Sequence, residues 1–141
     1  MKTSSLASLL QIAAILHLGL ICAGALMPRA VRLREHLSPL PPFIRRLFWV
    51  YYMFIGLCLF GFGALTLAFA PALASGAPLA RALCVFLTLF WMLRLVAATF
   101  LFDVRPYLVN GWLRLGYHAT NLAFIYLPAV YALAALRGGQ P

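Results

Sequence analysis

The chain has 141 residues, of which 65% are hydrophobic and only 9% are charged, whereas about 25% of the residues are charged in an ordinary soluble domain. Eleven basic and two acidic residues give a formal net charge of +9, and so few charges exclude both a water-soluble monomer and an intrinsically disordered chain. The length predicts one domain, residues 1–141, with room for four membrane spans of about 20 residues each.

Long apolar stretches follow one another along the chain. No charge occurs between Thr3 and Pro28 or between Leu47 and Ala80, and Arg94 is the one charge inside the third stretch. Each stretch is long enough to cross about 30 Å of hydrocarbon as a helix. The predicted spans are residues 5–27, 47–70, 82–102 and 113–136.

The short connections predict that successive spans pack as antiparallel neighbours. Because the stretches lack the strict alternation of a barrel strand, we expect an all-α integral membrane bundle of four transmembrane helices. Met27–Arg46 and Phe102–Arg114 are predicted to be loops, with a short interfacial helix within Arg29–Leu37. Gly56 and Gly63 return to nearly the same helix face and predict close helix contact, within the bundle or with another chain.

Basic residues are unevenly divided between the two sides of the predicted bundle. The first and third connections carry seven of them and the opposite side carries three, and basic short loops stay in the cytoplasm. We therefore expect both termini outside, in a cell membrane for which the bacterial inner membrane is the simplest assignment. The alternative is a cleaved signal peptide ending near Ala23–Ala25, which would leave the arginine-rich loop outside.

The arginines of the first connection predict a surface for anionic lipid headgroups. Each basic residue beside an anionic leaflet contributes about 1 kcal/mol, and their place at a membrane end argues against nucleic acid as the partner. The alternative is that they only set the topology. They are Arg29, Arg32, Arg34, Arg45 and Arg46.

An ionisable residue inside a span indicates a functional site by default. Arg94 lies in the third span, and Arg114, His118 and Asn121 share one face of the fourth by helical spacing. If these spans are neighbours, the site would take a phosphate or a carboxylate; alternatively, its members satisfy one another and lock two helices. The candidate ligand- or lipid-binding residues are Arg94, Asp103, Arg105, Tyr107, Arg114, Tyr117, His118 and Asn121.

His17 lies near the middle of the first span, and pairs of histidines on facing helices hold b-type haem in membrane bundles. The predicted depths of His17 and His118 differ by about 9 Å, so haem binding would need a strong helix tilt. The three cysteines lie at different depths and predict neither a disulfide nor a metal site. No cofactor and no metal are predicted.

Enzyme signatures are missing from the sequence: it has no paired carboxylates inside a span, no His-x-x-x-His, no P-loop and no Cys-x-x-Cys. The sequence therefore favours a small, non-catalytic accessory or scaffold subunit of a larger membrane assembly over an enzyme. The alternative is a lipid- or cofactor-binding membrane protein, or an enzyme, with an anion site at Arg94, His118 and Asn121. The expected partners are anionic lipids and other membrane subunits or further copies of the chain.

Overall fold

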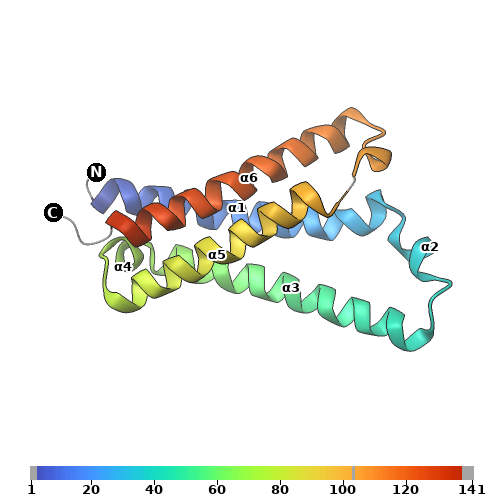
Figure 1. The fold of residues 1–141 in the computed structure, drawn as a ribbon, viewed down its shortest axis with the longest axis horizontal. Helices are drawn as coiled ribbons and strands as arrows, with labels where there is room; N and C mark the ends of the chain where they lie inside the picture. The colour runs from blue at the N-terminus through green and yellow to red at the C-terminus, as the bar shows by residue number, and fades with distance from the viewer. Residues whose placement is uncertain (1–2, 103, 138–141) are drawn as a thin grey trace.

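The computed structural model describes residues 3–102 and 104–137, and the regular elements in them are all helical (Figure 1). Among these residues, four helices are long and apolar enough to cross a membrane, as the prediction of an all-helical chain with four candidate spans requires. They are α1 (Thr3–Ala30), α3 (Pro42–Ala68), α5 (Pro78–Phe100) and α6 (Gly111–Arg137), and the short elements are α2 (Leu33–Leu37), α4 (Ala70–Ala74) and the 3-10 turn η1 (Arg105–Tyr107).

The prediction of a loop over Met27–Arg46 is wrong at both ends. α1 continues through Pro28 to Ala30, and α3 already begins at Pro42. A proline is tolerated in the first turn of a helix because its missing N–H would have no partner there. The prolines thus start α3 rather than extending the chain, and the first turn of α3 includes Arg45.

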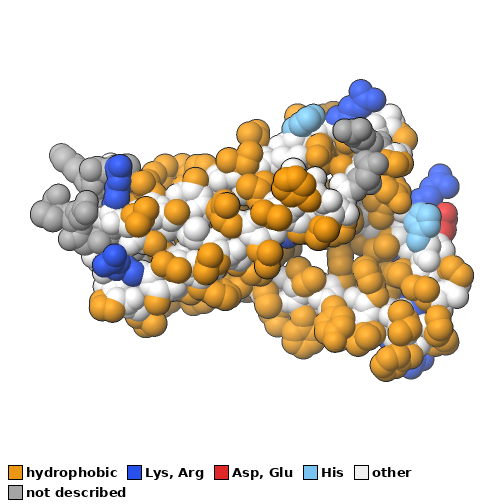
Figure 2. All heavy atoms as spheres, in the orientation of Figure 1, with side chains coloured by type: hydrophobic (Ala, Val, Ile, Leu, Met, Phe, Trp, Pro, Cys, Tyr) orange, Lys and Arg blue, Asp and Glu red, His pale blue; other side chains and the backbone are white. Residues whose placement is uncertain are grey.

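The long helices run back and forth, so that Thr3 and Arg137 lie at one end of the molecule (Figure 1). We call this the terminal end, and we call the end that carries α2 and η1 the basic end. α1 packs against α3, α4 and α6, whereas α5 packs chiefly against α6. Figure 2 shows hydrophobic side chains along the flank of the bundle and charged side chains gathered at the two ends, as a bilayer requires.

The core lies between the centre of the bundle and the terminal end. Its largest fully buried side chains include Leu10, Leu87, Trp91, Leu127 and Tyr131, from α1, α5 and α6. α3 contributes much less to the core, since only 11% of its apolar 18-residue stretch is buried, against 44% for the corresponding stretch of α6. α3 is therefore the least enclosed of the spans.

α1 and α3 approach each other closely at Gly63. A Cβ atom built on Gly63 would lie 2.9 Å from the Cβ of His17, whereas a Cβ on Gly56 would meet nothing within 4 Å. The predicted close contact is thus confirmed at Gly63, inside the bundle, and Gly56 takes no part in it. Because only a residue without a side chain fits at this crossing, Gly63 sets how near the two helices come.

Candidate functional site

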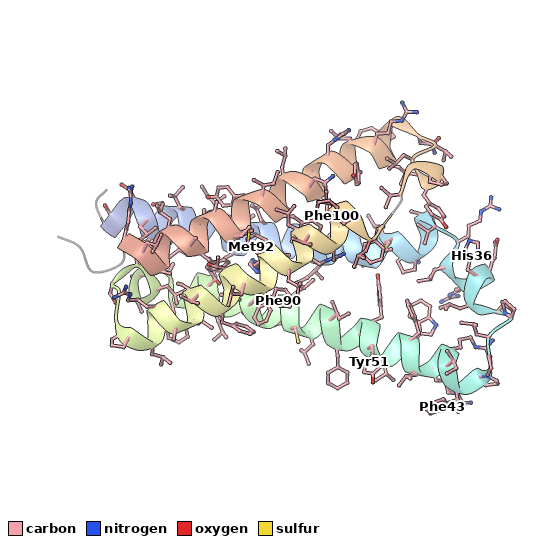
Figure 3. The ribbon with its side chains drawn as sticks, viewed as in Figure 1. His36, Phe43, Tyr51, Phe90, Met92 and Phe100 are labelled. Atoms are coloured by element: carbon pink, nitrogen blue, oxygen red, sulfur yellow. The ribbon has the colours of Figure 1, made fainter. Side chains whose placement is uncertain are left out.

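An open pocket of about 470 Å³ lies at the basic end, between α2 and the beginning of α3. Figure 3 labels one residue of each of these helices, His36 on α2 and Phe43 near the start of α3. We call it the basic pocket, since two of its five lining residues are arginines. It is lined by Arg34, Leu37, Ser38, Arg45 and Trp49.

Local backbone preferences build this pocket. Arg32 takes the left-handed conformation with φ 47°, which turns the chain out of α1 and into α2. After Leu37, Pro41 and Pro42 force a second change of direction before α3 begins. The two turns set α2 across the gap between the end of α1 and the start of α3, and the pocket lies in that gap.

The pocket carries strong positive charge. Arg45 lies in the first turn of α3, which contains no acidic residue, so its charge adds to the positive end of the helix dipole. Glu35 is the one acid among the described residues, and it lies 4.0 Å from Arg32, where both side chains are exposed. Arg34 and Arg45 thus form no salt bridge with an acidic side chain among the described residues.

The remaining arginines of the predicted lipid surface do not line the pocket. Arg29, Arg32 and Arg46 are exposed at the same end of the molecule. Of the five predicted residues, the structure therefore brings Arg34 and Arg45 into one pocket, and the other three lie outside it. Sequence reasoning missed Ser38 and Trp49 as lining residues, because neither carries a charge.

The second predicted site, around Arg94, is only partly described. The Arg94 guanidinium lies over the rings of Phe124 and Phe102, 5.1 and 5.7 Å from their centroids. No hydrogen bond among the described residues joins Arg94 to His118 or Asn121. Phe124, one turn beyond Asn121 in α6, is thus the observed neighbour of Arg94 on that helix.

The other members of that predicted site lie around the start of α6. Arg114 donates from Nε to the carbonyl oxygen of Leu108 at 3.2 Å, and the exposed His118 ring meets the Tyr117 ring edgewise at 5.4 Å. Tyr107 is exposed in η1 and Asn121 is half-buried. Asp103 and the side chain of Arg105 lie outside the described residues. The shared site therefore stays a prediction.

A buried polar cluster lies in the middle of the bundle, and sequence reasoning found only His17 in it. His17 is fully buried, with Nδ1 2.7 Å from the carbonyl oxygen of Ala13. Its ring packs edgewise against Trp91 and Tyr131, at centroid distances of 5.2 and 6.2 Å. The hydroxyl of Tyr131 lies 2.6 Å from that of Thr66. This cluster joins α1, α3, α5 and α6.

The two histidines of the predicted haem alternative lie in different surroundings. His17 is enclosed by Trp91, Tyr131 and the Gly63 crossing, whereas His118 is exposed near the start of α6. Haem binding by this pair stays a hypothesis. Among residues 3–102 and 104–137, no group of three His, Cys, Asp or Glu side chains stands ready for a metal ion.

No family model, no curated protein and no solved structure matches this chain. Its function is therefore inferred from the chemistry of the basic pocket and from the four apolar helices.

Proposed function

We propose that this multi-pass membrane protein is a non-catalytic accessory or scaffold subunit that holds an anionic phospholipid at its basic end. The observation that carries the proposal is the basic pocket, in which Arg34 and Arg45 face one space from two different helices. The proposed ligand is a glycerophospholipid with a net negative headgroup.

The residues of the pocket suit a phosphate. An arginine guanidinium presents parallel N–H donors that match two phosphate oxygens, and the Ser38 hydroxyl adds a donor or an acceptor for the rest of the headgroup. Trp49 is an amphipathic ring of the kind enriched at the membrane interface. Leu37, which is buried, supplies an apolar wall for the beginning of an acyl chain.

The proposed orientation places the basic end in the cytoplasm and both termini outside, as the positive-inside rule predicts. The cytoplasmic leaflet is the one that carries anionic lipids in most membranes. An arginine pocket on that side would therefore meet its ligand at high local concentration.

Binding of lipid to the purified full-length chain in nanodiscs tests this proposal. Native mass spectrometry with phosphatidylglycerol as the probe should give saturable binding that Arg34→Gln/Arg45→Gln weakens by about thirtyfold, because two arginines together contribute about 2 kcal/mol. Arg137→Gln, at the terminal end, is the matched control and should bind as the natural chain does. Equal loss in both variants, or equal affinity for phosphatidylcholine, would overturn the proposal.

The accessory role is supported by the exposed flank of α3. Phe43, Met53 and Phe54 are 71%, 70% and 60% exposed, respectively, and α3 is the least buried of the four candidate spans. Mild extraction of the tagged protein from its native membrane should yield a second protein in fixed stoichiometry, which Phe54→Ala releases and Leu136→Ala does not. A mass that stays at multiples of 15.6 kDa would contradict the accessory role.

A further inference from the structure

α3 and α5 meet at one place and then diverge. Phe62 of α3 packs edgewise against Phe90 and Phe86 of α5, with ring centroids 5.2 and 6.0 Å apart, and Figure 3 shows Phe90 between the two helices. Toward the basic end the ribbons separate, and the space-filling view is hollowed between them (Figures 1 and 2). The bundle is thus open on this side.

Arg94 lies beside this opening. It follows Phe90 by four residues, so it shares that helix face one turn nearer the basic end, just beyond the place where Phe62 ends the contact. Its side chain is exposed, and the rings of Phe124 and Phe102 hold the guanidinium at 5.1 and 5.7 Å. Two aromatic rings therefore fix a cation at the edge of the opening.

The depth of Arg94 makes this position costly without an anion. Arg94 lies six positions before Phe100, the last residue of α5, which is about 9 Å along the helix. A charged group exposed at such a depth is expensive in hydrocarbon and marks a ligand site or a pathway. Glu35 is the one acidic residue in the part of the chain that the structure describes. It lies in α2 and pairs with Arg32, not with Arg94.

The opposite wall of the opening is apolar. Cys58 and Ile55 lie one and two turns from Phe62 on the same side of α3, toward the basic end, and both are exposed. An acyl chain lying along α3 would cover this surface, and its polar end would reach Arg94.

We propose that Arg94 binds the carboxylate of a single-chain fatty acid that enters sideways from the bilayer between α3 and α5. A carboxylate matches the guanidinium fork with two oxygens and one negative charge. If a phospholipid phosphate bound Arg94 instead, the polar glycerol and headgroup of the lipid would also have to lie about 9 Å below the interface. This second site lies deeper than the basic pocket and does not depend on it.

Binding of oleate to the full-length protein in phosphatidylcholine nanodiscs tests the proposal. An environment-sensitive fluorophore on Cys58, with Cys22→Ser to prevent a second label, reports occupancy of the opening. Arg94→Gln should weaken oleate binding by about tenfold or more, as the loss of charge-assisted hydrogen bonds predicts. Methyl oleate, which has the same chain without the charge, should not compete.

Two further variants keep the outcome decisive. Arg94→Lys retains the charge but loses the fork, so it should fold normally and bind oleate more weakly than the natural chain, even if Arg94→Gln fails to fold. Arg34→Gln/Arg45→Gln should weaken phosphatidylglycerol binding and leave oleate binding unchanged, so the two proposed sites can be tested independently. Unchanged binding in Arg94→Lys and Arg94→Gln, competition by methyl oleate, or stronger displacement by lysophosphatidic acid would overturn the carboxylate site.

Discussion

Single residues in the middle of the bundle decide how tightly its helices cross. His17, Thr66 and Tyr131 come from three helices, and each is fully buried. In an apolar surrounding, hydroxyl groups must bond to one another or to the backbone, and the 2.6 Å contact between Thr66 and Tyr131 meets that need. Because Gly63 has no side chain, His17 fits between α1 and α3 and lies in the same buried cluster as Thr66 and Tyr131.

Gly63→Ala should lower the free energy of unfolding by about 1–3 kcal/mol, because its Cβ would lie 2.9 Å from that of His17 and overpacking costs that much. Gly56→Ala on the same helix meets nothing within 4 Å and should leave the stability unchanged or raise it by up to about 1 kcal/mol. Reversible unfolding in mixed micelles, followed by circular dichroism, measures both. Equal effects of the two substitutions would contradict the assigned crossing.

The hydrogen bond between Thr66 and Tyr131 should be measurable by a double-mutant cycle. Thr66→Val, Tyr131→Phe and the double variant are expected to give a coupling energy of about 0.6 kcal/mol and at most about 1.7 kcal/mol, the average and the maximum found for hydrogen bonds between membrane helices. The same unfolding assay supplies the four free energies. A coupling energy near zero would mean that the two hydroxyl groups do not bond in the membrane.

At the scale of elements, α3 differs from the other spans. It contacts α1 closely at Gly63 and leaves the bundle toward the basic end, which creates both the basic pocket and the opening beside Arg94 (Figure 1). The Tyr52 hydroxyl donates to the carbonyl oxygen of Gly24. The Tyr52 side chain is long enough to bridge α1 and α3 in the region where these helices separate. This bridge limits how far α3 leans away.

Tyr52→Phe should therefore loosen the beginning of α3. Spin labels at the exposed positions Leu26 and Ile44, in a background without exposed cysteines, report the distance between α1 and α3 at the basic end. The distance distribution should become broader and longer in Tyr52→Phe, and it should stay unchanged in Tyr51→Phe, whose side chain is 61% exposed. Identical distributions in the two variants would show that the bridge does not hold α3.

At the scale of the whole molecule, the charged side chains other than Arg94 are gathered at the ends, and apolar surface covers most of the flank between them (Figure 2). Thr3 and Arg137 lie at one end and the arginine-rich turns at the other. The positive-inside rule and an anionic inner leaflet therefore predict that the arginine-rich end faces inward.

A fusion at the C-terminus should test this orientation. Alkaline phosphatase joined after the last residue should be active, and green fluorescent protein at the same place should be dark, since both termini are expected outside. A fusion truncated after Ser38 should give the opposite pair of signals. Fluorescence from the C-terminal fusion would reverse the proposed topology and place the basic pocket outside.

The membrane class, the helical fold and the number of spans followed from the sequence. In hydrocarbon, every backbone N–H and C=O group must be hydrogen-bonded within the protein, which only helices and closed barrels achieve. Uncharged stretches of span length that lack the alternating pattern of barrel strands are therefore helices. The arginine-rich end was also predictable, because five arginines are clustered in the sequence between the first two uncharged stretches. The pairing of Arg34 with Arg45 in one pocket was not, because it depends on two turns at Arg32 and Pro41.

Only the tertiary structure decided which side chains meet. Thr66 and Tyr131 are 65 residues apart, and nothing in their spacing predicts a contact. Arg94 was predictable as an unusual charge, but its Phe124 neighbour and the opening toward α3 depend on where Phe62 meets Phe90. Apolar spans are compatible with many mutual rotations and tilts, and the choice among them is made by local fits such as the one at Gly63.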